Sequence, residues 1–391
     1  MRVWLACVAW GWMAAAGPAW GQVKWTTRTS PINSTLQGVG FGNGIFVAVA
    51  VDGTMALSKD NGEKWKLVNP GVGSSLTCVA YGNGTFVAMG ASGVALTSPN
   101  GTVWTVNNTG VNSTAAAVIY ANGRFTAVGA SGMVATSPDG RGWTQRALPG
   151  GYSGLLRGVT FGDGQFIAVG ASGAIFSSPT GATWTQQTSG VPQLLYDAAF
   201  GAGNFSVSGG VRLVLTSSNG TQWSSNNVLN PSTAWFERVI FGPKVFVGVG
   251  VQGNVQVSPT GGVWTQQATG TSNELMGIAE GDNVYVAVGT NGIILTSPVA
   301  VPVISRQPAS TSVKAGGTAK FSVKARGTGA LTYQWLKNGK NLKNTTRISG
   351  AREAKLIIAK VVKGDASASY QVRVTDSYGT TTSSNAKLTV K

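Results

Sequence analysis

The chain has 391 residues, 42% of them hydrophobic, and a formal net charge of +16. These values are typical of a folded protein with about two or three domains, and they exclude a chain that is disordered throughout. Because the sequence contains no histidine and two cysteines, we expect no zinc or copper site, no histidine-dependent nucleophile and no cofactor.

The first 21 residues have the layout of a secretory signal peptide. Arg2 supplies a positive charge, an apolar run continues to about Ala16, and Ala19 and Gly21 suit a cleavage site. The run is too short for a membrane span, and no later stretch approaches the ~18 apolar residues that a span needs. We therefore predict a signal peptide over residues 1–21 and a secreted protein that is periplasmic, extracellular or bound to the cell surface. Removal of the signal peptide, which contains Cys7, leaves Cys78 without an intrachain disulfide partner.

Residues 22–299 repeat with a period of about 40 residues. In each unit, short apolar or alternating runs are separated by three glycine-bearing turn signals, which predicts four antiparallel strands. Seven such units indicate a seven-bladed β-propeller, with a linear solenoid as the alternative. The repeated tryptophans are Trp25, Trp65, Trp104, Trp143, Trp184, Trp223 and Trp264.

The two ends of the repeat array favour a closed ring. Trp25 lies in "VKWTTR", which matches the fourth strand of a unit, although little mature sequence precedes it. The last unit stops at Pro298, before a tryptophan of its own. We therefore predict an all-β fold in which the N-terminal strand completes the last blade, an arrangement that removes exposed sheet edges.

A serine, glycine and tryptophan pattern marks the turn between the third and fourth strands. The fullest version is "SKDNGEKW" and a shorter one is "SPDGRGW". Serine and aspartate can accept hydrogen bonds from nearby backbone N–H groups, and glycine suits the turn. The pattern resembles the Asp-box of BNR-type, sialidase-like propellers over about residues 23–299, and this resemblance implies a structural motif away from any catalytic centre. The structural residues are Ser58, Asp60, Gly62, Trp65, Ser137, Asp139, Gly140 and Trp143.

The same resemblance suggests a carbohydrate-active enzyme. Sialidase-like catalysis needs an arginine cluster, an acidic general acid or base, and a tyrosine paired with a glutamate. Residues 23–299 hold seven arginines, no Arg-Ile-Pro segment near their start, and only the glutamates Glu63, Glu237, Glu274 and Glu280. We therefore predict no catalytic residue and a non-enzymatic protein, with a glycoside hydrolase as the alternative. A third reading is an assembly factor of the photosystem-stability type, whose propellers carry similar repeats; the basic C-terminal module and the signal peptide disfavour it.

Candidate binding residues stand where the repeats differ. Two adjacent columns stand just before the first strand of each unit. One is mostly small, but Asp197 and Arg238 interrupt it, and its neighbour contains Arg157, Tyr196 and Glu237. One interpretation is an ion pair between neighbouring blades. The other is a polar site for a sugar or peptide at the channel mouth, completed by Phe236 and other residues from the two longest loops between blades. Its candidate residues are Tyr152, Arg157, Tyr196, Asp197, Trp235, Glu237 and Arg238.

Residues 300–391 follow a proline-bearing hinge and show short alternating strands without repetition. They resemble a bacterial immunoglobulin-like domain, with Trp335 at the core tryptophan position and Tyr370 at the tyrosine corner. Val323 and Val372 occupy the usual disulfide positions. Asp365 precedes Tyr370 by five residues rather than the common four, which leaves the local turn open.

The positive charge belongs to this C-terminal module. Residues 301–391 contain 16 basic and three acidic residues, whereas residues 23–299 contain 12 and ten. The module is expected to attract polyanions, although a solvated basic surface without a partner is the alternative. Nucleic acid is not expected, because no aromatic residues alternate with the lysines. We expect a monomeric binding, adhesion or assembly protein whose partner is a glycan, a cell-surface polyanion or a protein.

Overall fold

The computed structural model describes residues 24–210, 212–227, 235–243, 245–298, 302–326, 331–376 and 379–391. The chain divides into two compact units, one over residues 23–299 and one that contains residues 300–391, and each is described by itself. The predicted signal peptide and most of the loop before Trp235 lie outside the described residues. Within the described part, no helix is long and apolar enough to cross a membrane.

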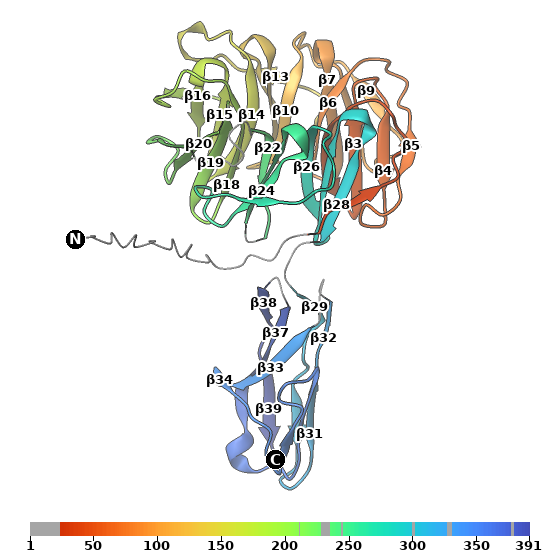
Figure 1. Ribbon diagram of the computed structural model, residues 1–391, viewed down its shortest axis with the longest axis vertical. Helices are drawn as coiled ribbons and strands as arrows, with labels where there is room; N and C mark the ends of the chain where they lie inside the picture. Colours follow the sequence, from red (N-terminus) through yellow and green to blue (C-terminus); the bar gives the residue numbers. More distant parts are fainter. Residues whose placement is uncertain are drawn as a thin grey trace, which may run out of the picture. The chain divides into compact units, whose positions relative to one another are not determined.

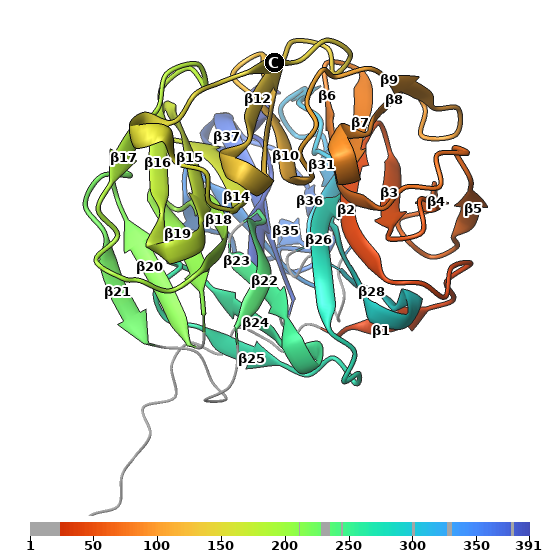
Figure 2. The ribbon, with the colours of Figure 1, turned by 90° about the horizontal axis from the view of Figure 1, so that it is seen from above.

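The first unit is built from four-stranded antiparallel sheets, seven in the described part of residues 24–298, arranged around a centre (Figures 1 and 2). We number these blades from 1 to 7 along the chain. From the innermost to the outermost strand they are blade 1, β2 (Leu36–Gly42), β3 (Ile45–Ala50), β4 (Met55–Ser58) and β5 (Lys66–Val68); blade 2, β6 (Leu76–Gly82), β7 (Thr85–Gly90), β8 (Ala95–Ser98) and β9 (Thr105–Asn107); blade 3, β10 (Ala115–Ala121), β11 (Arg124–Gly129), β12 (Val134–Ser137) and β13 (Thr144–Gln145); blade 4, β14 (Leu156–Gly162), β15 (Gln165–Gly170), β16 (Ile175–Ser178) and β17 (Thr185–Gln187); blade 5, β18 (Leu195–Gly201), β19 (Asn204–Gly209), β20 (Leu213–Ser217) and β21 (Ser224–Asn227); blade 6, β22 (Phe236–Phe241), β23 (Phe246–Gly250), β24 (Val255–Ser258) and β25 (Thr265–Gln267); and blade 7, β26 (Leu275–Gly281), β27 (Val284–Gly289), β28 (Ile294–Pro298) and β1 (Thr26–Arg28).

The ring closes through the N-terminal strand. β1 pairs antiparallel with β28, with Thr26 opposite Thr296. The first strands of neighbouring blades pack side by side around the whole ring, including β2 against β26. The all-β prediction is therefore confirmed, and the N-terminal strand completes the last sheet.

Glycine-bearing turns make the blades possible. Between β14 and β15, Asp163 and Gly164 have φ of 46° and 74°, both positive, as a two-residue hairpin of type I′ requires. Short 3-10 turns connect the second and third strands of five blades, and a further one precedes β14. These turns are η1 (Ala91–Gly93), η2 (Ala130–Gly132), η3 (Pro149–Gly151), η4 (Ala171–Gly173), η5 (Val251–Gly253) and η6 (Thr290–Gly292).

The core of the first unit lies between the faces of adjacent blades. The second strand of each blade carries an aromatic residue that is almost fully buried, such as Phe166 in blade 4. The Phe166 ring lies 6.4 Å from the ring of Trp184 in the same blade. Because the middle strands are buried on both faces, they hold the first strands firmly around the centre.

The second unit is a two-layered β-sandwich. Trp335 and Tyr370 are buried, and the Tyr370 hydroxyl donates to the Asp365 carbonyl oxygen at 2.7 Å, so the five-residue spacing still closes the corner. Arg347 forms an ion pair of 2.8 Å with the Asp365 carboxylate. The elements are β29 (Val303–Arg306), β30 (Thr311–Val313), β31 (Ala319–Ser322), β32 (Lys324–Arg326), β33 (Thr332–Lys337), β34 (Lys340–Asn341), β35 (Ile348–Ser349), β36 (Lys355–Ile358), η7 (Lys363–Asp365), β37 (Ser367–Asp376), β38 (Gly379–Thr382) and β39 (Ala386–Val390).

Candidate functional site

An extra residue interrupts the first strand of every blade at its second position. In blade 4, Leu156 lies opposite Gly170 and Gly158 opposite Val169, so Arg157 is the additional residue of a β-bulge. Such bulges redirect a side chain and are common beside functional sites. We call the seven bulge residues the bulge ring: Gln37, Thr77, Ala116, Arg157, Tyr196, Glu237 and Met276. The expectation that these columns precede the first strands was wrong, because they lie inside them.

The first strands enclose a central channel with a cavity of about 310 Å³. Its lining is largely apolar and includes Val79, Val118 and Val159, with Asp197 and Arg238 as its charged residues. Cys78 also lines the cavity, and burial raises the pKa of its thiol to about 11. The thiol is therefore protonated near neutral pH and unreactive as a nucleophile.

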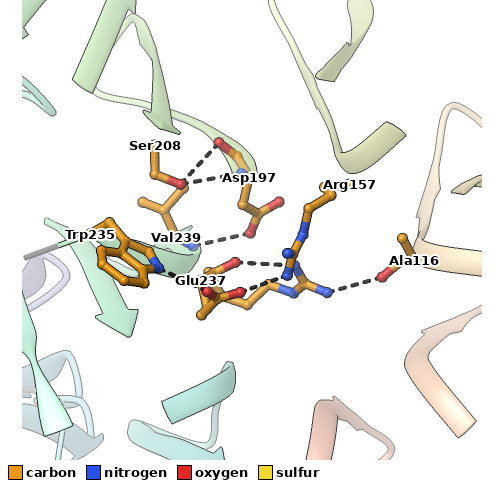
Figure 3. Close-up of polar contacts among 8 residues, drawn as sticks. Ala116, Arg157, Asp197, Ser208, Trp235, Glu237 and Val239 are labelled. Atoms are coloured by element: carbon orange, nitrogen blue, oxygen red, sulfur yellow. Dashed lines mark hydrogen bonds and ion pairs between the residues drawn. The ribbon is translucent and has the colours of Figure 1, made fainter. Parts of the chain in front are cut away.

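Glu237 holds two neighbours of the candidate site in place (Figure 3). Its Oε2 lies 2.6 Å from Nη2 of Arg157, and its Oε1 accepts a hydrogen bond of 3.0 Å from the Trp235 indole. Glu237 is buried, whereas the Arg157 side chain remains 24% exposed. A buried carboxylate requires such partners. The ion pair joins blades 4 and 6, and therefore spans the position of blade 5.

Aromatic rings from blades 5 and 6 complete this sector. The guanidinium carbon of Arg157 lies 4.8 Å from the centre of the Tyr196 ring, a cation–π contact. The Trp235 ring is 6.4 Å from that of Tyr196, with 21° between their planes. The sector therefore presents two nearly parallel aromatic rings beside a charged pair.

Glu274 is a member of this environment that the sequence columns missed. Burial, and then the charge of Glu237, raises the pKa of its carboxyl group, while the charge of Arg157 opposes the rise. Glu274 precedes the first strand of blade 7 by one residue, so it belongs to neither aligned column. The one signal in the sequence that could have identified Glu274 is that residues 23–299 contain only four glutamates.

Arg238 crosses the mouth of the channel. Its Nη1 donates to the Glu237 carbonyl oxygen at 3.1 Å, and its Nη2 donates to the Ala116 carbonyl oxygen of blade 3 at 3.0 Å. The guanidinium group thus links two distant first strands. Arg238 also lines the central cavity.

Asp197 is 7% exposed and its carboxylate accepts a hydrogen bond of 3.0 Å from the Val239 backbone N–H of the next blade. Burial raises its pKa to about 6, opposed by the charge of Arg238 and by that hydrogen bond. The ion pair of this sector, among the described residues, joins Arg157 to Glu237. The expected ion pair between blades is therefore present, but it joins Arg157 to Glu237 across blade 5 instead of two neighbouring blades. Asp197 is held by a backbone donor, and Arg238 donates to carbonyl oxygens.

Two of the predicted aromatic residues lie elsewhere. The Tyr152 hydroxyl donates to the carbonyl oxygens of Leu155 and Ala171, and its ring packs against Phe176 at 5.1 Å. Tyr152 lines a separate groove of about 730 Å³ on blade 4. Phe236 is fully buried against Trp264. The structure thus brings together Arg157, Tyr196, Asp197, Trp235, Glu237 and Arg238, but not Tyr152.

The serine, glycine and tryptophan motifs lie in the hairpins between third and fourth strands, at the outer rim. In blade 1, the Gly62 N–H donates to Ser58 Oγ at 3.0 Å and the Trp65 indole to the Gly62 carbonyl oxygen at 2.9 Å. The Asp60 carboxylate accepts from the Lys64 N–H at 2.9 Å. Blade 3 repeats these contacts with Ser137, Asp139, Gly140 and Trp143. In the described part of the chain, no group of three or more Cys, Asp or Glu side chains could hold a metal ion.

The comparisons with known proteins bear on the two units separately. A family model, the immunoglobulin I-set domain, matches residues 302–390. The C-terminal unit is an immunoglobulin-like domain. No curated protein matches the chain.

Solved structures similar to the chain share a propeller fold at low identity. YCF48 bound to D1 peptide has a TM-score of 0.59 and 16% identity, with 72% of this chain and 99% of that chain covered. YCF48 from Cyanidioschyzon merolae has a TM-score of 0.58 and 16% identity, with coverages of 70% and 98%. The WD40 propeller of Doa1 has a TM-score of 0.58 and 13% identity, with coverages of 71% and 96%. These likenesses show that the first unit is a β-propeller, whereas the Asp-box resemblance rests on the sequence pattern alone.

Proposed function

We propose that the propeller is a non-catalytic platform that binds a polypeptide segment on the bulge ring of blades 4 to 6. One observation carries this proposal: the bulge residues Arg157, Tyr196 and Glu237 stand on adjacent blades, while those of the other four blades are neither charged nor aromatic. A binding site on a rigid scaffold is commonly made by replacing side chains at geometrically equivalent positions. The bulge gives each of these side chains the same starting direction at the channel mouth.

The chemistry of this sector suits a peptide. Arg157 uses Nη2 for Glu237, and its partly exposed side chain has further N–H donors that can bond a peptide carbonyl or carboxylate oxygen. Tyr196 and Trp235 add flat apolar surface of the kind that dominates protein interfaces. That a propeller of the same fold, YCF48, was solved with a D1 peptide supports a polypeptide ligand over a sugar.

The titratable groups of the site favour binding over catalysis. Both carboxylate oxygens of Glu237 are engaged, Asp197 is buried, and the Cys78 thiol is neutral. We further propose that the protein is secreted, on the basis of the first 21 residues. The sialidase-like alternative makes a distinct claim, because it requires turnover of a glycoside that depends on the acidic residues of the propeller.

Selection of peptides from a random library on the full chain, followed by anisotropy titrations, tests the proposal. We expect Trp235→Ala and Arg157→Gln each to weaken binding of a selected peptide by about tenfold or more, because both side chains lie at the centre of the sector. Gln37→Ala, at the equivalent bulge position of blade 1, is the matched control and should change the dissociation constant by less than about twofold. Equal affinities for all four proteins would refute the site.

Glu237→Gln separates positioning from contact. The substitution removes the charge that holds Arg157 and replaces the acceptor of the Trp235 indole. We expect an unfolding free energy lower by about 1 to 2 kcal/mol and weaker peptide binding. The wild type and Glu237→Gln should also be assayed with aryl glycosides. Hydrolysis by the wild type that the substitution abolishes would instead establish a glycoside hydrolase.

A second function follows from the exposed lysines of the immunoglobulin-like domain. Lys320, Lys324 and Lys355 are exposed, and Lys355 lies opposite Ser322 on the strand paired with β31. We infer that this domain adheres to an anionic polymer. The full chain should be retained on heparin at ~50 mM salt, and replacement of the three lysines by glutamine should lower the eluting salt concentration. Unchanged elution would refute this adhesion surface.

A further inference from the structure

Blade 1 differs from its relatives at the outer rim. Its hairpin between β4 and β5 has one residue more than the hairpins of blades 2 to 6, and it carries Lys59, Lys64 and Lys66. At the first and third of these positions the other blades have no basic residue, and at the second only blade 7 has one, Lys24. The counterparts in blades 2 to 6 are Pro99, Val103 and Thr105; Pro138, Gly142 and Thr144; Pro179, Thr183 and Thr185; Ser218, Gln222 and Ser224; and Pro259, Val263 and Thr265.

These lysines line a groove of about 640 Å³ whose apolar wall includes Leu57 and Leu67. All three lysines are exposed, and their ammonium groups have no hydrogen bond or ion-pair partner within the described residues. Asp60 also lines the groove, but its carboxylate accepts hydrogen bonds from Ser58 Oγ and the Lys64 N–H of its own hairpin. The groove therefore combines a net positive charge, from three lysines and the Asp60 carboxylate, with an apolar wall.

The groove runs along a free sheet edge. β5 is the outermost strand of blade 1 and, among the strands of the described residues, pairs only with β4, so one row of its backbone N–H and C=O groups is open there. Leu67, in the middle of β5, is 55% exposed. At the equivalent position blade 2 has Val106, which is 58% exposed, whereas blades 3, 4 and 6 have Gln145, Gln186 and Gln266.

Edge lysines often serve only to prevent strands from pairing. That explanation predicts lysines on the outer edges generally, yet the outer strands β1, β9, β13, β17, β21 and β25 contain none. The basic residue of β1, Arg28, donates to Thr296 within its own blade. It also does not account for an exposed leucine at the centre of the one edge that has them. The combination matches strand addition, in which the backbone supplies affinity and alternate side chains supply specificity.

We propose that blade 1 docks an extended acidic and apolar polypeptide segment, which adds to the free edge of β5. Carboxylates of the segment pair with Lys59, Lys64 and Lys66, and its apolar side chains cover Leu67. The apolar wall favours such a segment over a sulfated glycan, which would use the charges alone. This surface lies on blade 1 and is independent of the bulge ring of blades 4 to 6.

The test uses the full chain and a fluorescent peptide of alternating glutamate and valine, with anisotropy as the measurement. We expect saturable binding that weakens by about tenfold or more in a Lys59→Gln, Lys64→Gln, Lys66→Gln variant and by at least about threefold in Leu67→Gln. Leu67→Gln installs the residue of three other blades, so the fold is expected to persist. Arg141→Gln, an exposed basic residue in the hairpin of blade 3, is the control and should leave binding unchanged.

Methylation of alternate backbone nitrogens of the peptide examines the strand pairing itself. It should abolish binding if the peptide adds to β5, because the methyl groups replace the donors of the ladder. The proposal is overturned if the peptide fails to bind, if Arg141→Gln weakens it as much as the lysine variant, or if the methylated peptide binds equally. It is also overturned if a sulfated oligosaccharide binds the three lysines more tightly than the peptide and does so independently of Leu67.

Discussion

The bulge ring has two sectors with the same backbone and different chemistry. Blades 4 to 6 carry Arg157, Tyr196 and Glu237 at the bulge, whereas blades 1 to 3 carry Gln37, Thr77 and Ala116 in the same register. The repeat therefore determines where a side chain begins, and the local substitution determines what it can bind. The comparison locates candidate function where the repeats diverge.

The two sectors also differ one residue further along the strand. In blades 1, 4 and 7 this position is glycine, in blade 3 it is Ala117, and in blades 5 and 6 it is Asp197 and Arg238. Seven strands approach closely around the centre, so a large side chain in one blade requires space from its neighbour. Gly158 provides that space for Asp197: a methyl group built on Gly158 would lie 2.6 Å from both Cα and Oδ1 of Asp197.

Gly158→Ala should give the largest effect. The added methyl group meets the backbone of blade 5, which cannot move without disturbing the ring, so we expect a loss of about 3 kcal/mol in unfolding free energy. Urea unfolding followed by tryptophan fluorescence would measure it. Gly142→Ala is the control, because a methyl group there meets nothing within 4 Å. Similar stabilities for the two variants would show that the channel is looser than the structure indicates.

The pH dependence of stability tests the buried carboxyl group of the same pair of strands. The pKa of Asp197 rises from an ordinary value of 3.8 to about 6 on folding, chiefly through burial. Because the folded state binds this proton more tightly, the contribution of Asp197 to stability is greatest below pH 3.8 and is lost as the pH rises toward about 6. The full loss corresponds to about 3 kcal/mol at most.

Asp197→Asn isolates that contribution, since its amide oxygen can still accept the hydrogen bond from Val239. Unfolding free energies of both proteins should be measured from pH 4 to pH 7.5. We expect the wild type to lose stability relative to the variant across this interval. A constant difference between the two proteins would mean that Asp197 is better solvated than its burial implies.

The fold was largely accessible from the sequence, because each repeat carries its own turn chemistry. The glycines between the strands, the regular tryptophans and the displaced N-terminal strand sufficed to predict an all-β ring closed by residues 26–28. The bulge was not accessible, since Leu156 and Arg157 give no local signal that one residue will lack a partner. It is seen only in the pairing register of the first and second strands.

The site was predicted in part, because aligning the repeats shows the positions at which one unit differs from the others. Aligned columns identified Arg157, Tyr196 and Glu237, because a charged or aromatic residue stands out among residues that are neither. They did not reveal that Glu237 pairs with Arg157 across blade 5, or that Arg238 reaches a carbonyl oxygen of blade 3. Those contacts depend on distances across the channel, which no spacing along the chain contains.

The smallest expected effect concerns the outer hairpins, where blades 1 and 4 also differ. The Asp60 carboxylate accepts from Ser58 Oγ at 2.8 Å and from the Lys64 N–H at 2.9 Å, whereas Thr180 Oγ1 accepts one hydrogen bond of 3.3 Å from the Ala182 N–H. Asp60→Ala should therefore cost about 1 kcal/mol and Thr180→Ala about 0.5 kcal/mol or less. Unfolding free energies at pH 7 would distinguish these outcomes.

The effect of Asp60→Ala should also depend on pH in the opposite sense to that of Asp197. Burial raises the pKa of Asp60, but the hydrogen bonds from Lys64 and Ser58 outweigh it and lower the pKa below 3.8. The contribution of Asp60 is therefore present above pH 3.8 and is lost as the pH falls through its lower folded value. Equal costs for Asp60→Ala and Thr180→Ala at pH 7 would show that serine, glycine and tryptophan hold these hairpins without the acidic residue, so that its retention in blade 1 would need another cause, such as the adjacent lysine groove.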